Sequence, residues 1–530
     1  MRIGSAAFFA FLALTCFSPG GYSQSDERWK QLNADGGRAY EQGRYREAET
    51  LLSAALKEAQ RFGTENPRFA SSLSNLAQLY QAQGRYAEAE PLHKRALSIS
   101  EKVLGPEHPV VAHNLNNLAV VYQAQGRYAE AEPLHKRALS LRERVLGPEH
   151  PEVAISLNSL GELYRAQGKY GEAEPLHKRA LSIREKVLGP EHPHVAASLN
   201  SIAELYRVQG RYAEAEPLHK RSLAIREKLL GREHLDVATS LNNLALVYQA
   251  QGKYAEAEPL YKRALPIGEK VLGAEHPDVA IGFDNLAALY RAQGRYAEAE
   301  PLHKRALANF EKALGPEHPD LAIGLANLAE LYRAQGRYAD AEPLHKRALS
   351  ILEKVLGPEH PEVAFSLNDL AELYHDQSQF GKAEPLYKRA LSIRERVLGR
   401  EHLGVALSLN NLAALYRDQG RYTEAEPLYE RALAIREKAV GPEHPNVGAS
   451  LNGLAVVYRE QGRYSDAESL FKRAVTIAEK SLGPEHLNLA KSLEDYALLM
   501  RKTNREAEAT ALEARAKAIR AKHAEGKARK

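Results

Sequence analysis

The hydrophobic pattern of the chain repeats, and one copy, residues 151–193, predicts two α-helices. In its first half, small or apolar residues recur every three or four positions, at Val153, Leu157, Leu160, Gly161 and Tyr164. Gly168 interrupts this pattern, and a second stripe of the same kind runs through residues 173–188. Because one helical hairpin cannot bury both stripes, neighbouring copies are expected to complete its core.

The turn between the two helices recurs along almost the whole chain. The motif QGRY or QGKY begins at Gln42, Gln83, Gln125, Gln167, Gln209, Gln251, Gln293, Gln335, Gln419 and Gln461, with a degenerate copy, QSQF, at Gln377. The linker LGPEHP follows the same period of 42 residues; its glycine suits the end of a helix and its last proline suits the first turn of the next. The pattern predicts eleven clear hairpins and a degenerate twelfth.

One family shows this arrangement of small and aromatic residues. A turn glycine, a tyrosine and an alanine (Gly126, Tyr128, Ala131), preceded by Leu118, Ala119 and Tyr122, resemble the tetratricopeptide repeat. The longer 42-residue form, with SLNNLA, GRYAEAEPLHKRAL and GPEHP in one register over residues 29–514, is similar to the repeats of kinesin light chains and their bacterial relatives. The resemblance implies an all-α, right-handed superhelical solenoid of about twelve hairpins that holds peptides in its concave groove.

The two ends of the chain depart from the repeat. Residues 1–23 combine a basic start, a short apolar run and small residues, which predicts a cleaved signal peptide and export to the periplasm or the outside. An uncleaved membrane anchor is the alternative, and a lipoprotein through Cys16 is disfavoured by its poor lipobox. Residues 24–514 are expected to form the solenoid, with no membrane span after cleavage, and residues 515–530 a basic, frayed tail.

Composition and motifs give no sign of catalysis. The net charge of +4 is small for 530 residues and predicts no nucleic-acid binding. A phosphate loop, HExxH and GxSxG are all absent from the sequence, so we expect no catalytic residues, metal or cofactor. Ten histidines lie in the linkers and are interpreted as helix caps. Six more, which exchange with tyrosine or phenylalanine in other repeats, are interpreted as packing residues: His93, His135, His177, His219, His303 and His345.

Asparagines in the first helix of each repeat are the first candidate for peptide contact. They occupy one or both positions before the Leu-Ala pair, although asparagine is a poor residue for a helix interior. The residues proposed to line the groove are Asn117, Asn158, Asn200, Asn243, Asn285, Asn327 and Asn411. An amide both donates and accepts hydrogen bonds, as a peptide backbone requires. The alternative is that these amides bond only to one another between repeats.

Arginines one position after the tyrosine that recurs in the first helix are the second candidate. They are Arg165, Arg207, Arg291, Arg333, Arg417 and Arg459. Because glutamates such as Glu162 offset some of them, the groove is expected to favour acidic or mixed peptides only weakly. The function predicted is a non-enzymatic scaffold for protein or peptide ligands, and the alternative is a self-associating structural protein.

A few repeats break the pattern. Pro266 and Gly268 fall inside a predicted helix and should weaken it, since proline removes a helical hydrogen bond. Ser378 replaces a turn glycine, and the linkers at Gly231 and Gly399 lack both prolines. These positions are expected to mark changes of curvature.

Overall fold

The chain folds into twelve helical hairpins, as the sequence predicts. The computed structural model describes residues 24–528, which contain 24 α-helices and no strand. The predicted signal peptide, residues 1–23, lies outside the described part. The helices are α1 (Gln24–Glu41), α2 (Tyr45–Gln60), α3 (Pro67–Ala82), α4 (Tyr86–Leu104), α5 (Pro109–Ala124), α6 (Tyr128–Leu146), α7 (Pro151–Ala166), α8 (Tyr170–Leu188), α9 (Pro193–Val208), α10 (Tyr212–Leu230), α11 (Leu235–Ala250), α12 (Tyr254–Leu272), α13 (Pro277–Ala292), α14 (Tyr296–Leu314), α15 (Pro319–Ala334), α16 (Tyr338–Leu356), α17 (Pro361–Asp376), α18 (Phe380–Leu398), α19 (Leu403–Asp418), α20 (Tyr422–Val440), α21 (Pro445–Glu460), α22 (Tyr464–Leu482), α23 (Leu487–Lys502) and α24 (Glu506–Ala528).

Each helix boundary has a local cause. At the start of α7, His150 Nδ1 accepts a hydrogen bond from the backbone N–H of Glu152, 3.2 Å away, and so caps the helix. The glycine of the turn after α7, Gly168, has φ +71°, and the one that ends α8, Gly189, has φ +90°. Backbone at these angles favours glycine. All ten linker histidines cap an odd-numbered helix in this way, which confirms their predicted role.

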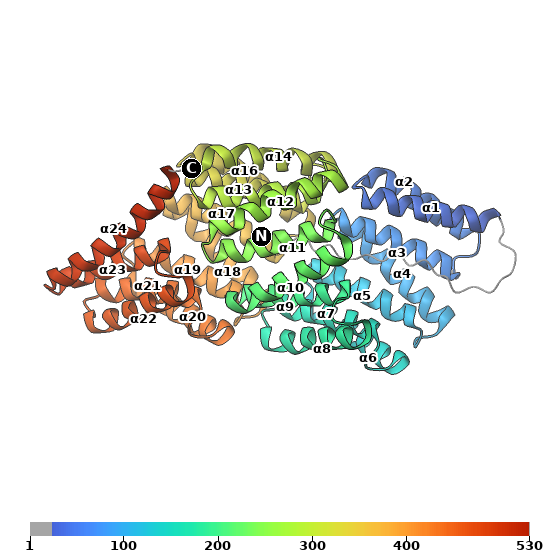
Figure 1. Ribbon diagram of the computed structural model, residues 1–530, viewed down its shortest axis with the longest axis horizontal. Coiled ribbons are helices and arrows are strands. Elements are labelled where there is room, and N and C mark those ends of the chain that lie inside the picture. The colour runs from blue at the N-terminus through green and yellow to red at the C-terminus, as the bar shows by residue number, and fades with distance from the viewer. Residues whose placement is uncertain (1–23, 529–530) are drawn as a thin grey trace.

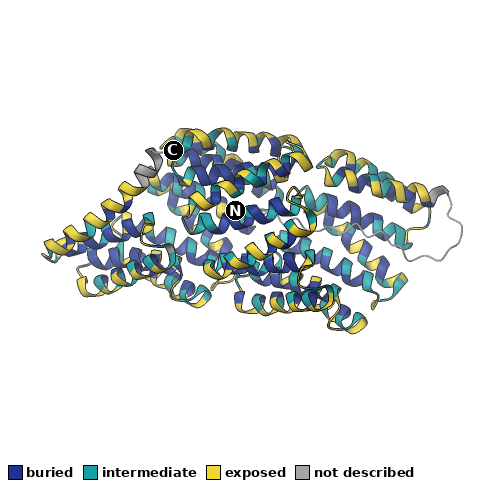
Figure 2. Cartoon of the chain, in the orientation of Figure 1, coloured by how far each residue is buried: buried dark blue, intermediate teal, exposed yellow. Residues whose placement is uncertain are grey.

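The core lies between the helices of each hairpin and between successive hairpins (Figure 2). The six second-helix histidines are fully buried, which confirms that they pack. In repeat four, His177 occupies the space beside Gly161, where a Cβ would lie 2.7 Å from the imidazole ring. Successive odd-numbered helices pack against each other more closely than successive even-numbered ones, so the odd helices line the inner side of the curve.

The solenoid winds tightly enough for its first coil to touch its second. Hairpin turns of repeats one to six lie against linkers of the later repeats, and a Cβ on any of these turn glycines would lie 2.6–3.1 Å from the opposing residue. The pairs are Gly43 with His276, Gly84 with Pro319, Gly126 with Pro361, Gly168 with His402, Gly210 with His444 and Gly252 with His486. In Figure 1 the blue and cyan helices of the first coil lie at the right and the orange and red helices of the second at the left.

Hydrogen bonds and apolar contacts join the two coils. His318, His360 and His402 place Nε2 at 3.0, 2.9 and 3.2 Å from backbone carbonyl oxygens 236 residues earlier, in Ala82, Ala124 and Ala166. Leu403 and Val440 of the second coil pack against a core cluster of the first coil, residues 118–205. The contact therefore recurs from repeat to repeat around the superhelix.

Turns of the second coil have no such neighbour in the described part of the chain. A Cβ on Gly336, Gly420 or Gly462 would meet nothing within 4 Å. Here two turns tolerate other residues, Ser378 with φ +57° and Asn504 with φ +59°. The Ser378 turn keeps the hydrogen bond of the glycine turns, since its N–H donates to His375 O at 2.8 Å. The irregular repeats therefore retain the hairpin.

Other expected irregularities also leave the helices intact. Helix α12 runs without interruption through Pro266 and Gly268, and α11 and α19 begin at a leucine in place of proline under the same histidine cap. Helix α24 continues to Ala528, so most of the tail expected to fray is helical, and Ala516 and Ile519 are buried. Among the described residues, no helix is both long and apolar enough to cross a bilayer.

Candidate functional site

The asparagines on the inner face form a ladder between repeats. At several interfaces, one of the two positions before the Leu-Ala pair contacts the other position in the neighbouring repeat. Asn285 Nδ2 donates to Asn242 Oδ1 at 3.1 Å, and Asn327 Nδ2 donates to Asp284 Oδ2 at 2.6 Å. Asn117 Nδ2 lies 3.3 Å from Ser74 Oγ. These amides thus contribute to the stacking of repeats, and their contact with a peptide stays a prediction.

The remaining predicted asparagines also contact the protein. Asn158 Oδ1 and Asn200 Oδ1 accept from the packing histidines His177 and His219, at 3.1 and 2.7 Å. Asn411 Nδ2 donates to Glu372 Oε1 at 2.9 Å. Asn243 is different: it is 3% exposed, and its Oδ1 has no hydrogen-bond partner in the described structure. A buried acceptor without a donor is unfavourable, so Asn243 marks a place where a donor would be stabilised.

All six predicted arginines lie beside carboxylates. The closest N–O distances are 2.8 Å for Arg165–Glu162, 2.6 Å for Arg207–Glu204, 4.0 Å for Arg291–Glu330, 2.6 Å for Arg333–Asp376, 2.7 Å for Arg417–Asp418 and 2.8 Å for Arg459–Glu460. The charges of five of them are therefore largely offset within the protein, whereas the buried Nε of Arg291 has no hydrogen-bond partner among the described residues. The predicted offset by glutamates is present, and it is stronger than the sequence suggests.

Carboxylates accumulate on the inner face of repeats eight and nine. Burial, followed by the nearby charges of Glu330 and Glu372, raises the pKa of Asp369 to about 8 against the opposing effect of Arg394 and Arg333. Burial also raises the pKa of Glu372. A cationic group bound here would favour the ionised form of these carboxyl groups, which burial and their mutual repulsion disfavour.

Exposed apolar residues on the inner face were missed by the sequence analysis. They lie at the fifth position of the odd helices, where Ile155 is 41% exposed and Phe365 is 45% exposed. A signal was present, because this position lies off the core stripe and yet carries large apolar residues in several repeats. Such residues can bury apolar surface against a bound segment.

A second missed feature is a buried arginine between successive repeats. Arg142, Arg184, Arg226, Arg394 and Arg436 lie at equivalent positions of even helices, and each donates to the hydroxyl of a serine 14 residues later, at 2.6–2.8 Å. Four of them also donate to a backbone carbonyl ten residues later, at 2.7–3.2 Å. Burial lowers the pKa of Arg184, Arg394 and Arg436 to about 10.

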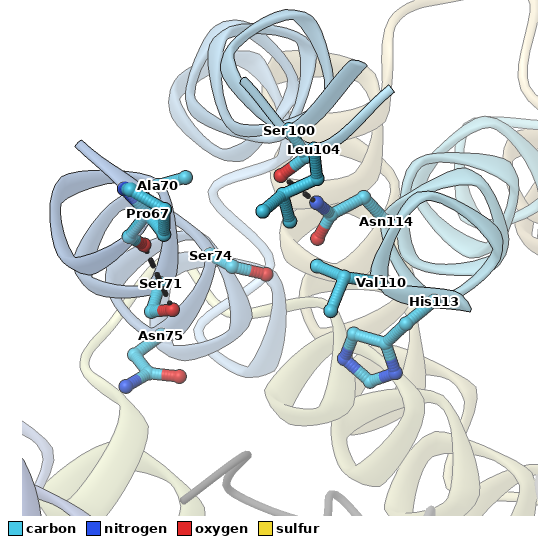
Figure 3. A pocket seen from close by; sticks show the side chains of 10 residues that line it. All are labelled: Pro67, Ala70, Ser71, Ser74, Asn75, Ser100, Leu104, Val110, His113 and Asn114. Atoms are coloured by element: carbon cyan, nitrogen blue, oxygen red, sulfur yellow. Dashed lines mark hydrogen bonds between the residues drawn. The ribbon is translucent and has the colours of Figure 1, made fainter. Parts of the chain in front are cut away.

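Other repeat interfaces replace this arginine. Between repeats two and three, Ser100 and Asn114 hold the two positions and hydrogen-bond at 2.9 Å beside a cavity of about 20 Å³ (Figure 3). Between repeats six and seven, Gly268 and Gly282 hold them, and a cavity of about 100 Å³ lies there. Both interfaces lack the arginine and its serine partner, and the cavity is larger where glycine replaces both.

Comparison with known proteins supports the assignment of the repeat. The chain matches the tetratricopeptide repeat family over residues 37–102, 68–142, 111–186, 157–228, 194–270, 236–312, 278–354, 320–396, 373–437, 404–480 and 463–522. No match was found among curated proteins.

Several solved structures are similar to the chain. Crystal structures of a kinesin-light-chain protein with nearly identical TPR-like repeats from Podosopora anserina include one with 33% identity, covering 38% of this chain and 96% of that one, at a TM-score of 0.34. The crystal structure of BtubC from P. vanneervenii has 26% sequence identity to this chain. The match covers 46% of this chain and 92% of BtubC, with a TM-score of 0.36. The crystal structure of yeast Tom70 has 19% sequence identity. The match covers 91% of this chain and 97% of Tom70, with a TM-score of 0.45.

Within the described residues, no group of three or more histidine, cysteine or carboxylate side chains could hold a metal ion.

Proposed function

Because the chain belongs to the tetratricopeptide repeat family, we propose that it is a non-catalytic scaffold that holds extended segments of partner proteins on its inner face. Proteins built from this repeat generally act as protein-interaction scaffolds. The observation that carries the proposal is the exposure of Ile155 and Phe365 on the inner side of the solenoid. Apolar side chains there gain about 1.5–3 kcal/mol each when a bound segment buries them.

The charges of the inner face favour a segment of mixed charge. An acidic segment would meet arginines that already pair with carboxylates, as Arg207 does with Glu204. A segment that also carries basic residues would be stabilised near Asp369 and Glu372, where carboxylates are in excess. The weak acidic preference expected from the sequence therefore becomes a preference for mixed segments in this proposal.

The test uses peptides selected from a displayed library on the mature chain. Selected peptides should bind tenfold or more weakly to Phe365→Ser or to Ile155→Ser, according to which repeats they contact. Val187→Ser is the matched control, because Val187 is 48% exposed but lies on an even helix. If every selected peptide binds all three variants as it binds the wild type, the inner-face proposal is wrong.

Export remains part of the proposal, and it rests on the sequence of residues 1–23. The mature chain should begin near Gln24 and be found outside the cytoplasm. N-terminal sequencing of the protein from cell fractions tests this, and an intact Met1 in the soluble cytoplasmic fraction would contradict it.

A further inference from the structure

The cavity between repeats six and seven has the position of an arginine side chain. Gly268 occupies the position that holds the buried arginine in the five interfaces described above, which are called the sister interfaces here. Gly282 occupies the position of the serine that accepts a hydrogen bond from that arginine. The cavity is lined by α11, α12 and α13, and a Cβ on Gly268 would meet only Val279 Cγ2, at 3.4 Å. At about 100 Å³ it exceeds the ~10–15 Å³ that one water molecule needs, and it has room for a planar guanidinium.

The acceptors that surround the arginine in other interfaces are present at this one. Arg436 Nη1 lies 3.3 Å from Asn410 Oδ1 and 2.7 Å from Asn446 O. The equivalent groups here are Asn242 Oδ1 and the carbonyl of Asp278, and both residues line the cavity. An amide oxygen has two lone pairs, so Asn242 Oδ1 can accept a second bond beside that from Asn285.

A carboxylate and an unpaired amide oxygen add to this set. Arg142 Nη2 lies 3.1 Å from the carboxylate of Glu152, and Asp278 has the equivalent position at this interface. Asn243 Oδ1, which is buried without a donor, belongs to a residue that also lines the cavity. The site thus offers acceptors and negative charge, and Gly282 removes only the serine hydroxyl.

The cavity opens beside the inner-face position described above. Thr239 and Ile281, which line it, hold the same helix position as Phe365, and in repeat nine the Phe365 ring covers the Arg394 guanidinium at 4.3 Å. Thr239 is much smaller than phenylalanine and leaves the equivalent place uncovered. Between repeats seven and eight, Phe310 and Gly324 hold the arginine and serine positions, and the phenylalanine ring fills the space, since a Cβ on Gly324 would lie 3.3 Å from it. A side chain of a segment on the inner face can therefore enter between repeats six and seven.

We propose that the cavity lined by Asn242, Asn243 and Asp278 binds an arginine side chain supplied by the partner segment. The bound guanidinium takes the place of the internal arginine that five other repeat interfaces carry, and it donates to the acceptors that surround that arginine there. This inference deepens the proposed scaffold function and rests on it for the source of the arginine.

The test titrates N-acetyl-arginine amide into the mature chain and follows binding by calorimetry. Saturable one-to-one binding is expected, and N-acetyl-citrulline amide, which has a similar shape without the charge, should bind at least tenfold more weakly. Gly268→Arg with Gly282→Ser restores the sequence of the sister interfaces and should abolish binding. Thr239→Phe, which covers the opening without filling the cavity, should weaken binding at least tenfold and keep the chain folded.

Three outcomes would overturn the inference. They are no saturable binding up to roughly 20 mM, equal binding of the citrulline derivative, and unchanged binding to a folded Gly268→Arg/Gly282→Ser or Thr239→Phe variant. The probe is a single amino-acid derivative and is not a peptide. If it does not bind, the scaffold proposal is still tested separately by the peptides and the Phe365 and Ile155 variants. Conversely, unchanged binding of every selected peptide to the Phe365 and Ile155 variants would leave the binding of N-acetyl-arginine amide to this cavity as a separate result.

Discussion

The linker histidines of the first coil and those of the second share one sequence motif but differ in surroundings. His150 is exposed and only caps α7. His360 is 6% exposed; its Nδ1 accepts from Glu362 N at 3.1 Å, and its Nε2 lies 2.9 Å from Ala124 O in the first coil. The linker histidine therefore only caps a helix in the first coil, whereas in the second coil it caps a helix and also contacts the other coil.

The double contact fixes the protonation state of the buried ring. Since Nδ1 accepts the backbone N–H, the neutral imidazole carries its hydrogen on Nε2, which donates to the carbonyl of the other coil. Protonation would add a hydrogen to Nδ1 and remove the helix cap. Linker histidines of the first coil such as His150 have no such contact with the second coil among the described residues.

Lowering the pH should have the largest effect on the stability that the buried linker histidines of the second coil contribute. Burial lowers the pKa of His402 and His444 to about 4, and it also lowers the pKa of His276. These pKa values lie below the ordinary 6.5, so the neutral rings contribute stability that is complete above pH 6.5 and is lost as the pH falls toward 4. For His402 and His444 the loss is about 3 kcal/mol each. Denaturant titrations from pH 7 to pH 4 measure it.

A pair of variants separates the coil contact from the other buried histidines. His402→Asn with His444→Asn keeps the caps, as Asn66 does for α3, and should flatten the pH dependence. His150→Asn with His192→Asn should keep the wild-type slope, because burial lowers the pKa of packing histidines such as His135 in every variant alike. Equal slopes for the two pairs would refute the assignment.

A methyl group added to a turn should distinguish the coils next. Gly210→Ala and Gly336→Ala each place alanine at a positive φ, which costs about 1–2 kcal/mol. At Gly210 the new Cβ also lies 2.6 Å from His444, and this overlap should add about 1–3 kcal/mol. Urea unfolding measures both losses. The same loss for the two variants would mean that the coils do not touch in solution.

The smallest effect is expected for a single lost hydrogen bond. His360→Asn keeps a capping side chain but removes the bond to Ala124 O, so stability should fall by about 1 kcal/mol. His150→Asn should change it by less than about 0.5 kcal/mol. Amide hydrogen exchange around residues 124–127 should quicken only in the His360 variant, and quickening in both would contradict the comparison.

Local features of the fold could be predicted from the sequence. The turn motif and the linker determine where helices begin and end, because positive-φ glycine, helix-capping histidine and first-turn proline act within a few residues. The exchange of His177 and its equivalents with Tyr261 identified a packing position. The contact between Gly210 and His444 could not be predicted, because it depends on small rotations that accumulate over more than five repeats.

The candidate site was predicted less well. Placing the asparagines on the inner helices was reasonable, but bonds such as Asn285 to Asn242 depend on an offset between neighbouring helices that one repeat does not reveal. The buried arginines did leave a signal in the sequence. Arg184 is followed by serine 14 residues later, as are its equivalents, whereas Gly268 is followed by Gly282. The simultaneous change to glycine at both positions is the signal in the sequence that corresponds to the cavity.

The coil contact also changes how the chain unfolds. In a simple repeat protein each unit has neighbours only before and after it, so stability is a sum along one dimension. Here a hairpin in the first coil also has a neighbour about 236 residues away, as in the bond from His402 to Ala166 O. A hairpin of the first coil therefore packs against the hairpin before it, the hairpin after it and a linker of the second coil. Local unfolding of that hairpin is opposed by all three contacts. Cooperativity should therefore extend across the coils, and only the terminal repeats should fray independently.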